Sequence, residues 1–174
     1  MHMRTLSVCL VMILVVFLTA CFHTSDIKPL SVKTVVEIER IYNENETLFK
    51  NAAEVLVHYA NSTYLVIQPI GAEQGEYNIP IWFYELGGIL IKSAEPLSNS
   101  QCQEIQAVTE PLIVEHNLYL ISGGHGRVRF SIDQGAGQSA ELLYLTADGE
   151  TALGFGTKEE RYFDENWYAA ITSD

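Results

Sequence analysis

The chain has 174 residues, of which 48% are apolar and 10% aromatic, enough for one domain with a core and too apolar for a disordered acidic tail. Its 10 Lys and Arg stand against 22 Asp and Glu, and the net charge of −12 argues against nucleic-acid binding, whose affinity comes from cations that neutralise phosphates. Three cysteines exclude a disulfide-dense scaffold.

Residues 1–20 have the pattern of an export signal. Arg4 is the only formal charge, and the segment from Leu6 to Leu18 is apolar except for Ser7. As a helix this run spans about 20 Å, which is short of the roughly 30 Å hydrocarbon core of a bilayer. The pattern therefore predicts a signal sequence rather than a membrane span.

The tetrad Leu18-Thr19-Ala20-Cys21 resembles the lipobox of bacterial lipoproteins. The resemblance implies cleavage before Cys21 and lipidation of Cys21, which would anchor the chain at the extracytoplasmic face of the cell membrane. Each buried methylene of an acyl chain contributes about 0.8 kcal/mol, so two or three chains anchor stably. An ordinary cleaved signal peptide that carries a cysteine, or an uncleaved anchor, is the alternative.

This interpretation divides the chain into a signal peptide at 1–20, a lipidated cysteine with a polar tether at 21–33, and one domain at 34–174. Cleavage would leave nine Lys and Arg against 22 acids, a net charge of −13. Cys102 would then be the only cysteine besides Cys21, so we expect no disulfide within the domain.

The domain begins with a predicted long helix over 34–60. Thr34 and Glu37 have capping-box spacing, and apolar residues then recur at steps of three and four. The polar run at 43–46 is either a break in this helix or its wet side. A second helix is predicted over 101–115 after Ser98 or Ser100, with a kink or restart at Pro111.

Strand patterns occupy most of the remaining chain. Strands are predicted at 63–68, 79–86 and 89–92, the last two joined by a hairpin turn at Gly87-Gly88. A meander is predicted from strands at 118–122, 127–133, 139–147 and 150–155, with a turn at Asp148-Gly149, followed by a charged loop at 158–161 and a strand at 166–172. The expected fold class is α+β, with two helices on a mostly antiparallel sheet that ends in a β-meander.

Catalytic and metal-binding patterns are not found in the sequence. Gly123-Gly124-His125-Gly126 is followed by a strand rather than a helix, so it predicts a hairpin loop and not a phosphate-binding loop. The histidines lack metal-ligand spacing, and Cys102 and His116 would lie about 21 Å apart along a continuous helix. We therefore predict no catalytic residue, metal or cofactor.

Two arginines form the one local pattern that suggests binding. Arg127 and Arg129 project from the same strand face, beside the loop that carries His125. One interpretation is cross-strand pairing with Glu141 and other acids; the other is contact of His125, Arg127 and Arg129 with an anion or a partner.

Large aromatic residues occur consecutively in two predicted strands. They are Trp82, Phe83 and Tyr84 in one and Trp167 and Tyr168 in the other, so both sheet faces carry aromatic side chains. One face is either covered by the second helix or available to a ligand, and we predict cover because exposed apolar patches on monomers are small.

The order of elements, with Asp148-Gly149 and Asn166-Trp167-Tyr168, is similar to that of small secreted and lipoprotein domains of Firmicutes, although Ala169 and Ala170 replace the usual aromatic. That resemblance implies packing motifs and no activity. We predict a membrane-anchored, non-catalytic binding or interaction domain with an envelope protein as possible partner. The alternatives are a small cell-envelope hydrolase with a carboxylate-based site, or a structural surface protein.

Overall fold

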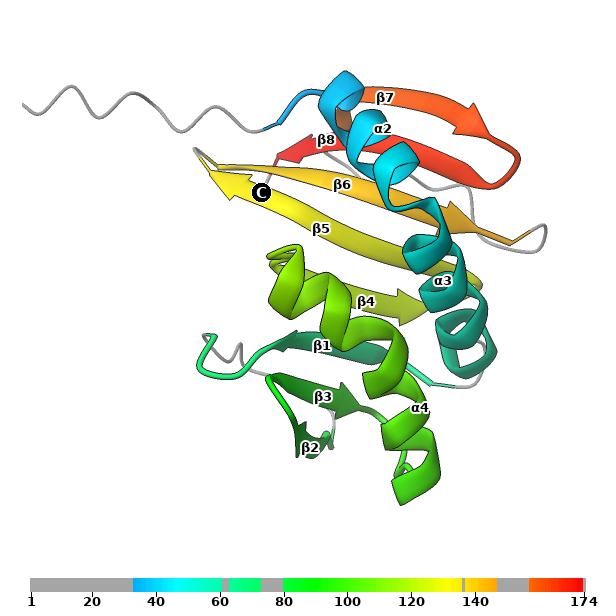
Figure 1. The fold of residues 1–174 in the computed structure, drawn as a ribbon, viewed down its shortest axis with the longest axis vertical. Helices are drawn as coiled ribbons and strands as arrows, with labels where there is room; N and C mark the ends of the chain where they lie inside the picture. The colour runs from blue at the N-terminus through cyan, green and yellow to red at the C-terminus, as the bar shows by residue number, and fades with distance from the viewer. Residues whose placement is uncertain (1–32, 61–62, 73–79, 136, 147–156, 174) are drawn as a thin grey trace, which may run out of the picture. The chain divides into compact units, whose positions relative to one another are not determined.

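Three helices pack on one face of an eight-stranded antiparallel sheet (Figure 1). This computed structural model describes residues 33–60, 63–72, 80–135, 137–146 and 157–173. The arrangement confirms the predicted α+β class. No helix in these described ranges is long and apolar enough to cross a membrane.

The predicted first helix is two helices, α2 (Val35–Glu44) and α3 (Glu46–Ala60). Thr34 caps α2 through the predicted capping box, in which its hydroxyl accepts from the Glu37 amide and the Glu37 carboxylate accepts from the Thr34 amide. The break falls at Asn45, whose side-chain amide donates to the Ile41 carbonyl at 3.0 Å. Of the two interpretations of the polar run, the break is confirmed.

The second predicted helix begins as α4 (Asn99–Glu110), capped by Ser98, and ends as the π-helical turn η1 (Pro111–Glu115). Pro111 has no amide hydrogen, so the regular helical ladder is interrupted there. The wide turn closes with the His116 amide donating to the Pro111 carbonyl at 3.2 Å. Of the expected kink or restart at Pro111, the structure shows a restart, in which the α-helix changes to a π-helical turn.

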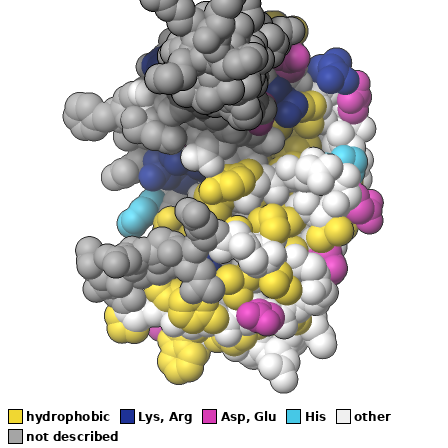
Figure 2. Space-filling view, turned by 90° about the vertical axis from the view of Figure 1, so that its left-hand side faces the viewer, with side chains coloured by type: hydrophobic (Ala, Val, Ile, Leu, Met, Phe, Trp, Pro, Cys, Tyr) yellow, Lys and Arg dark blue, Asp and Glu magenta, His cyan; other side chains and the backbone are white. Residues whose placement is uncertain are grey.

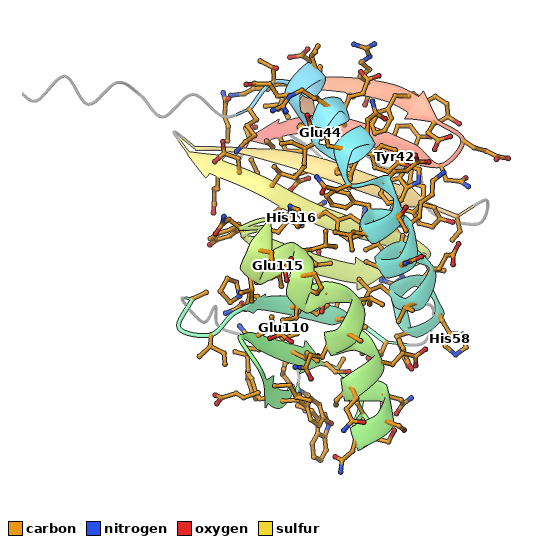
Figure 3. The ribbon with its side chains drawn as sticks, in the orientation of Figure 1. Tyr42, Glu44, His58, Glu110, Glu115 and His116 are labelled. Atoms are coloured by element: carbon orange, nitrogen blue, oxygen red, sulfur yellow. The ribbon has the colours of Figure 1, made fainter. Side chains whose placement is uncertain are left out.

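The strands follow the order β2-β3-β1-β4-β5-β6-β8-β7 across the sheet. The β2–β3 turn is held from α4, because Glu110 accepts from the Gly88 amide at 3.1 Å (Figure 3). The strands are β1 (Leu65–Pro69), β2 (Trp82–Leu86), β3 (Ile89–Ser93), β4 (Leu120–Gly124), β5 (Arg127–Gly135), β6 (Gln138–Leu145), β7 (Thr157–Asp164) and β8 (Trp167–Ser173).

One expectation for the C-terminal third needs correction. The charged segment 158–161 is not a loop but part of β7, the edge strand. The sheet ends in the expected hairpin meander, in which β8 lies between β6 and β7. The predicted strand at 150–155, the turn at Asp148-Gly149, and the signal and lipobox residues lie outside the described residues.

Aromatic rings join the helices to the sheet. Trp167 lies beneath Tyr42 at 4.8 Å between ring centroids, and Phe49 meets Phe130 edge-on at 5.2 Å. Such pairs contribute about 0.5–1.5 kcal/mol beyond their buried area. Trp167 and Phe130 therefore lie on the face of the sheet that the helices cover. Because side chains alternate along a strand, the residues next to them lie on the opposite face.

Register places the predicted arginines on that opposite face. Ser122, Arg129, Leu143 and Tyr168 form one row of paired residues across β4, β5, β6 and β8. Directly paired residues share a sheet face. Arg127 lies two residues before Arg129, so both arginines lie on the side away from the helices.

Candidate functional site at the β4–β5 turn

The β4–β5 connection is the predicted hairpin turn. His125 and Gly126 have φ values of 53° and 73°, the left-handed values that a tight two-residue hairpin favours. A positive φ is uncommon for a residue with a side chain, although histidine tolerates it better than most. The turn leaves the His125 side chain exposed at its tip.

A cavity of about 100 Å³ lies beside this turn and brings the three predicted binding residues together. His125, Arg127 and Arg129 line it, with Ser122, Gly123, Gly124 and Tyr64. Gly124 packs closely against Tyr64, since a Cβ atom there would lie 3.2 Å from the Tyr64 ring and the ring would have to shift slightly. Sequence reasoning does not find Tyr64 as a site residue, because it comes from the start of the distant strand β1 that pairs with β4.

One of the two arginines is held by a buried carboxylate. Arg129 Nε lies 3.4 Å from Glu141 Oε2, and the Glu141 side chain is only 5% exposed. The predicted pairing of the arginines with Glu141 is therefore confirmed for Arg129. The paired arginine also lines the cavity, so the ion pair does not remove Arg129 from this site.

Among the described residues, the other two histidines and Cys102 do not join this site. His58 is exposed in the last turn of α3 and His116 is exposed just after η1, on separate helical segments (Figure 3). Cys102 is buried, and burial raises the pKa of its thiol, so it is an inert core residue rather than a nucleophile. Within the described ranges, no three His, Cys, Asp or Glu residues could hold a metal ion.

Carboxylates gather at a second cavity, of about 180 Å³, beside the β7–β8 turn. Glu54, Asp164 and Glu165 line it together with Lys50. The Glu165 amide first, and then Tyr42 and Lys50, hold the pKa of Asp164 below its ordinary value. Asp164 is therefore ionised at neutral pH, which suits an ion-paired structural carboxylate and not a general acid.

A wider groove of about 630 Å³ lies at the other end of the sheet from the β4–β5 turn. Its lining includes Ile113, Leu118, Tyr119, Ile132 and Asp133. Figure 2 views the left-hand end of Figure 1 and shows hydrophobic side chains spread across it. The sequence carries no signal for this groove, since it forms between η1 and strands that are distant in the chain.

The aromatic prediction is confirmed in part. Tyr84 is half-buried, and its hydroxyl accepts from the Leu97 amide at 2.7 Å. Trp82 and Phe83 are each about half exposed, so the expected cover by the second helix is wrong for them. Trp167 is buried and Tyr168 half-buried in β8.

No protein-family model, curated protein or solved structure matches the chain.

Proposed function

We propose that the protein is a lipid-anchored, extracytoplasmic and non-catalytic binding domain that recognises an anionic group on an envelope partner. Lipidation at Cys21 supplies the attachment, as the lipobox resemblance implies. The observation that carries the binding role is the convergence of His125, Arg127 and Arg129 on one cavity. These arginines are two of only nine Lys and Arg that follow the signal peptide in a strongly acidic chain.

The chemistry of the cavity suits a carboxylate or a phosphate. The planar guanidinium group can donate two parallel hydrogen bonds to a pair of oxygens of either anion. The pairing with Glu141 restricts Arg129 before a ligand arrives. Small-molecule sites commonly enclose about 300–1,000 Å³, well above this cavity. The cavity therefore suits one acidic group of a larger partner rather than a whole metabolite.

The alternative, a carboxylate-based envelope hydrolase, would use the acids beside the β7–β8 turn. Hydrolysis of this kind needs one carboxyl group kept protonated by a raised pKa. The lowered pKa of Asp164 supports the non-catalytic function over this alternative.

Cross-linking and pull-down from the native envelope test the binding role. The lipidated protein is compared with R127A/R129A and with K158A/R161A, a control that removes the same charge from β7. We expect one stoichiometric partner, lost with the first pair and kept with the second. Equal recovery with both variants would refute the role of the cavity. A Cys21→Ser variant tests the anchor separately, since it should leave the membrane fraction.

A further inference from the structure

We infer that the end of the domain bearing the 630 Å³ groove docks on the lipid bilayer, with the apolar acyl region of the leaflet as its occupant. This inference rests on the proposed lipid anchor. It assigns a role to the groove, which the proposed binding function does not use. It also determines the direction in which the cavity lined by His125, Arg127 and Arg129 faces relative to the membrane.

The first described residue of the domain lies beside this groove. The Lys33 amide donates to Asp133 Oδ2 at 3.3 Å, and its ammonium lies 3.5 Å from the same oxygen. Asp133 is itself part of the groove lining. Only residues 22–32 separate Lys33 from Cys21, and the covalent geometry of a chain of that length limits its reach to at most about 40 Å.

The groove presents apolar side chains to its surroundings. Val114 and Tyr119 line it and are 51% and 48% exposed, and Ile70, at 48%, follows the lining residue Pro69. Ile113 and Leu118, which also line the groove, are buried. A tyrosine among exposed aliphatic residues suits the boundary between headgroups and acyl chains.

The negative charge of the domain opposes its approach to the membrane, and the tether to the lipid anchor offsets this repulsion. An acidic domain is repelled by an anionic leaflet, so apolar contact must provide the attraction. A short tether holds the groove at a high effective concentration near the lipid, which makes weak contact sufficient. Docking should therefore be stronger on zwitterionic than on anionic vesicles.

Docking at the groove directs the cationic cavity away from the membrane. Arg127 begins β5 at the cavity, and Asp133 lies six residues further along the same strand at the groove. Six residues of strand span about 20 Å. The cavity would face a partner on the far side from the leaflet.

Fluorescence quenching tests the docked orientation in the mature chain lipidated on Cys21. Y119W and Y64W place a fluorophore at opposite ends of the sheet, at positions with similar exposures of 48% and 46%. Both are made in a W82F chain, in which buried Trp167 is the only other tryptophan. In phosphatidylcholine vesicles with brominated acyl chains, we expect strong quenching of the Y119W chain. The Y64W chain should be quenched no more than the W82F chain alone.

A matched pair of charge insertions distinguishes contact from proximity. Val114→Glu should abolish the quenching in the Y119W chain, while Val36→Glu, at a comparably exposed site on α2, should leave it unchanged. Vesicle flotation reports the anchor independently. If the chain floats with the vesicles but the Y119W and Y64W positions are quenched equally, the docking is overturned and the lipid anchor stands. If the lipidation-competent chain does not float, both the docking and the anchor are overturned.

Discussion

The Tyr42 hydroxyl donates a hydrogen bond to Asp164 Oδ2 at 3.0 Å and so joins α2 to the β7–β8 turn across 122 residues of sequence. Lys50, on α3, reaches the same oxygen at 3.4 Å. Asp164 therefore ties both N-terminal helices to the C-terminal hairpin. Burial is the main cause that raises the pKa of Tyr42, which keeps its proton available for this bond.

Replacing Tyr42 with Phe should lower the free energy of unfolding by about 1 kcal/mol, the usual net value of such a bond. The ring packing on Trp167 is kept in this variant, so the change isolates the hydroxyl. Urea denaturation measures it, with Y119F at a half-exposed position as the control. Equal midpoints for both variants would contradict the assigned role.

Stability should depend on pH through Asp164. The pKa of Asp164 is lower in the folded state than in the unfolded chain. The stability that ionised Asp164 contributes is therefore full at pH values above the ordinary aspartate pKa of about 3.9. It is lost as the pH falls through the lower pKa of the folded state. D164N lacks this titration. We expect the difference in unfolding free energy between wild type and D164N to be full at neutral pH and to vanish in acid. A constant difference across that range would exclude this linkage.

Arg129 and Glu141 should behave as a coupled pair. R129A leaves the Glu141 carboxylate without its guanidinium neighbour in a buried position, and we expect a loss of about 2 kcal/mol. E141Q removes that charge, so R129A/E141Q should lose less than the sum of the single variants. A double-mutant cycle in urea measures the coupling. Strict additivity would mean that the pair makes no energetic contribution.

The turn at Gly87 should resist substitution more than a comparable turn elsewhere. Gly87 has φ +57°, and a Cβ atom there would lie 2.3 Å from Glu110 Oε1 and 2.7 Å from Gln106 Nε2. Gly71 also has positive φ, at +90°, but open space around it. Both atoms near Gly87 end flexible side chains, but Glu110 can move aside only by giving up its hydrogen bond from the Gly88 amide. We therefore expect G71A to cost about 1 kcal/mol and G87A roughly twice that. Thermal or urea unfolding of both variants provides the comparison.

Local patterns predict the helical elements well. The capping box at Thr34, the helix start after Ser98 and the interruption at Pro111 depend on a few neighbouring residues, and the structure contains all three. The polar run at 43–46 allows both a break and a wet face, and the structure shows a break, with the Asn45 side chain donating to the Ile41 carbonyl.

The charged segment 158–161 resembles a loop in sequence because β7 lies at the sheet edge. Its side chains at these positions are exposed on both sheet faces, so the alternation that marks a half-buried strand is missing. The strand assignment follows from pairing with β8, which the sequence does not display.

The candidate site is only partly accessible to sequence reasoning. His125, Arg127 and Arg129 are near neighbours in a hairpin, and their proximity follows from strand geometry. Tyr64 joins them through the pairing of β1 with β4, a long-range contact without a local signal. The groove at Val114 is also not predicted from the sequence, because the π-helical turn that carries Val114 meets distant strands there.

The two borders of the sheet have opposite consequences for self-assembly. β7 displays charged side chains along its length, which discourages addition of another strand. β2 carries Trp82 and Phe83 and only one charged residue, Glu85, so it lacks that protection. Two copies that met through β2 would leave a β7 border on each outer side. Growth by this route would therefore end at a pair of copies and would not continue into a polymer.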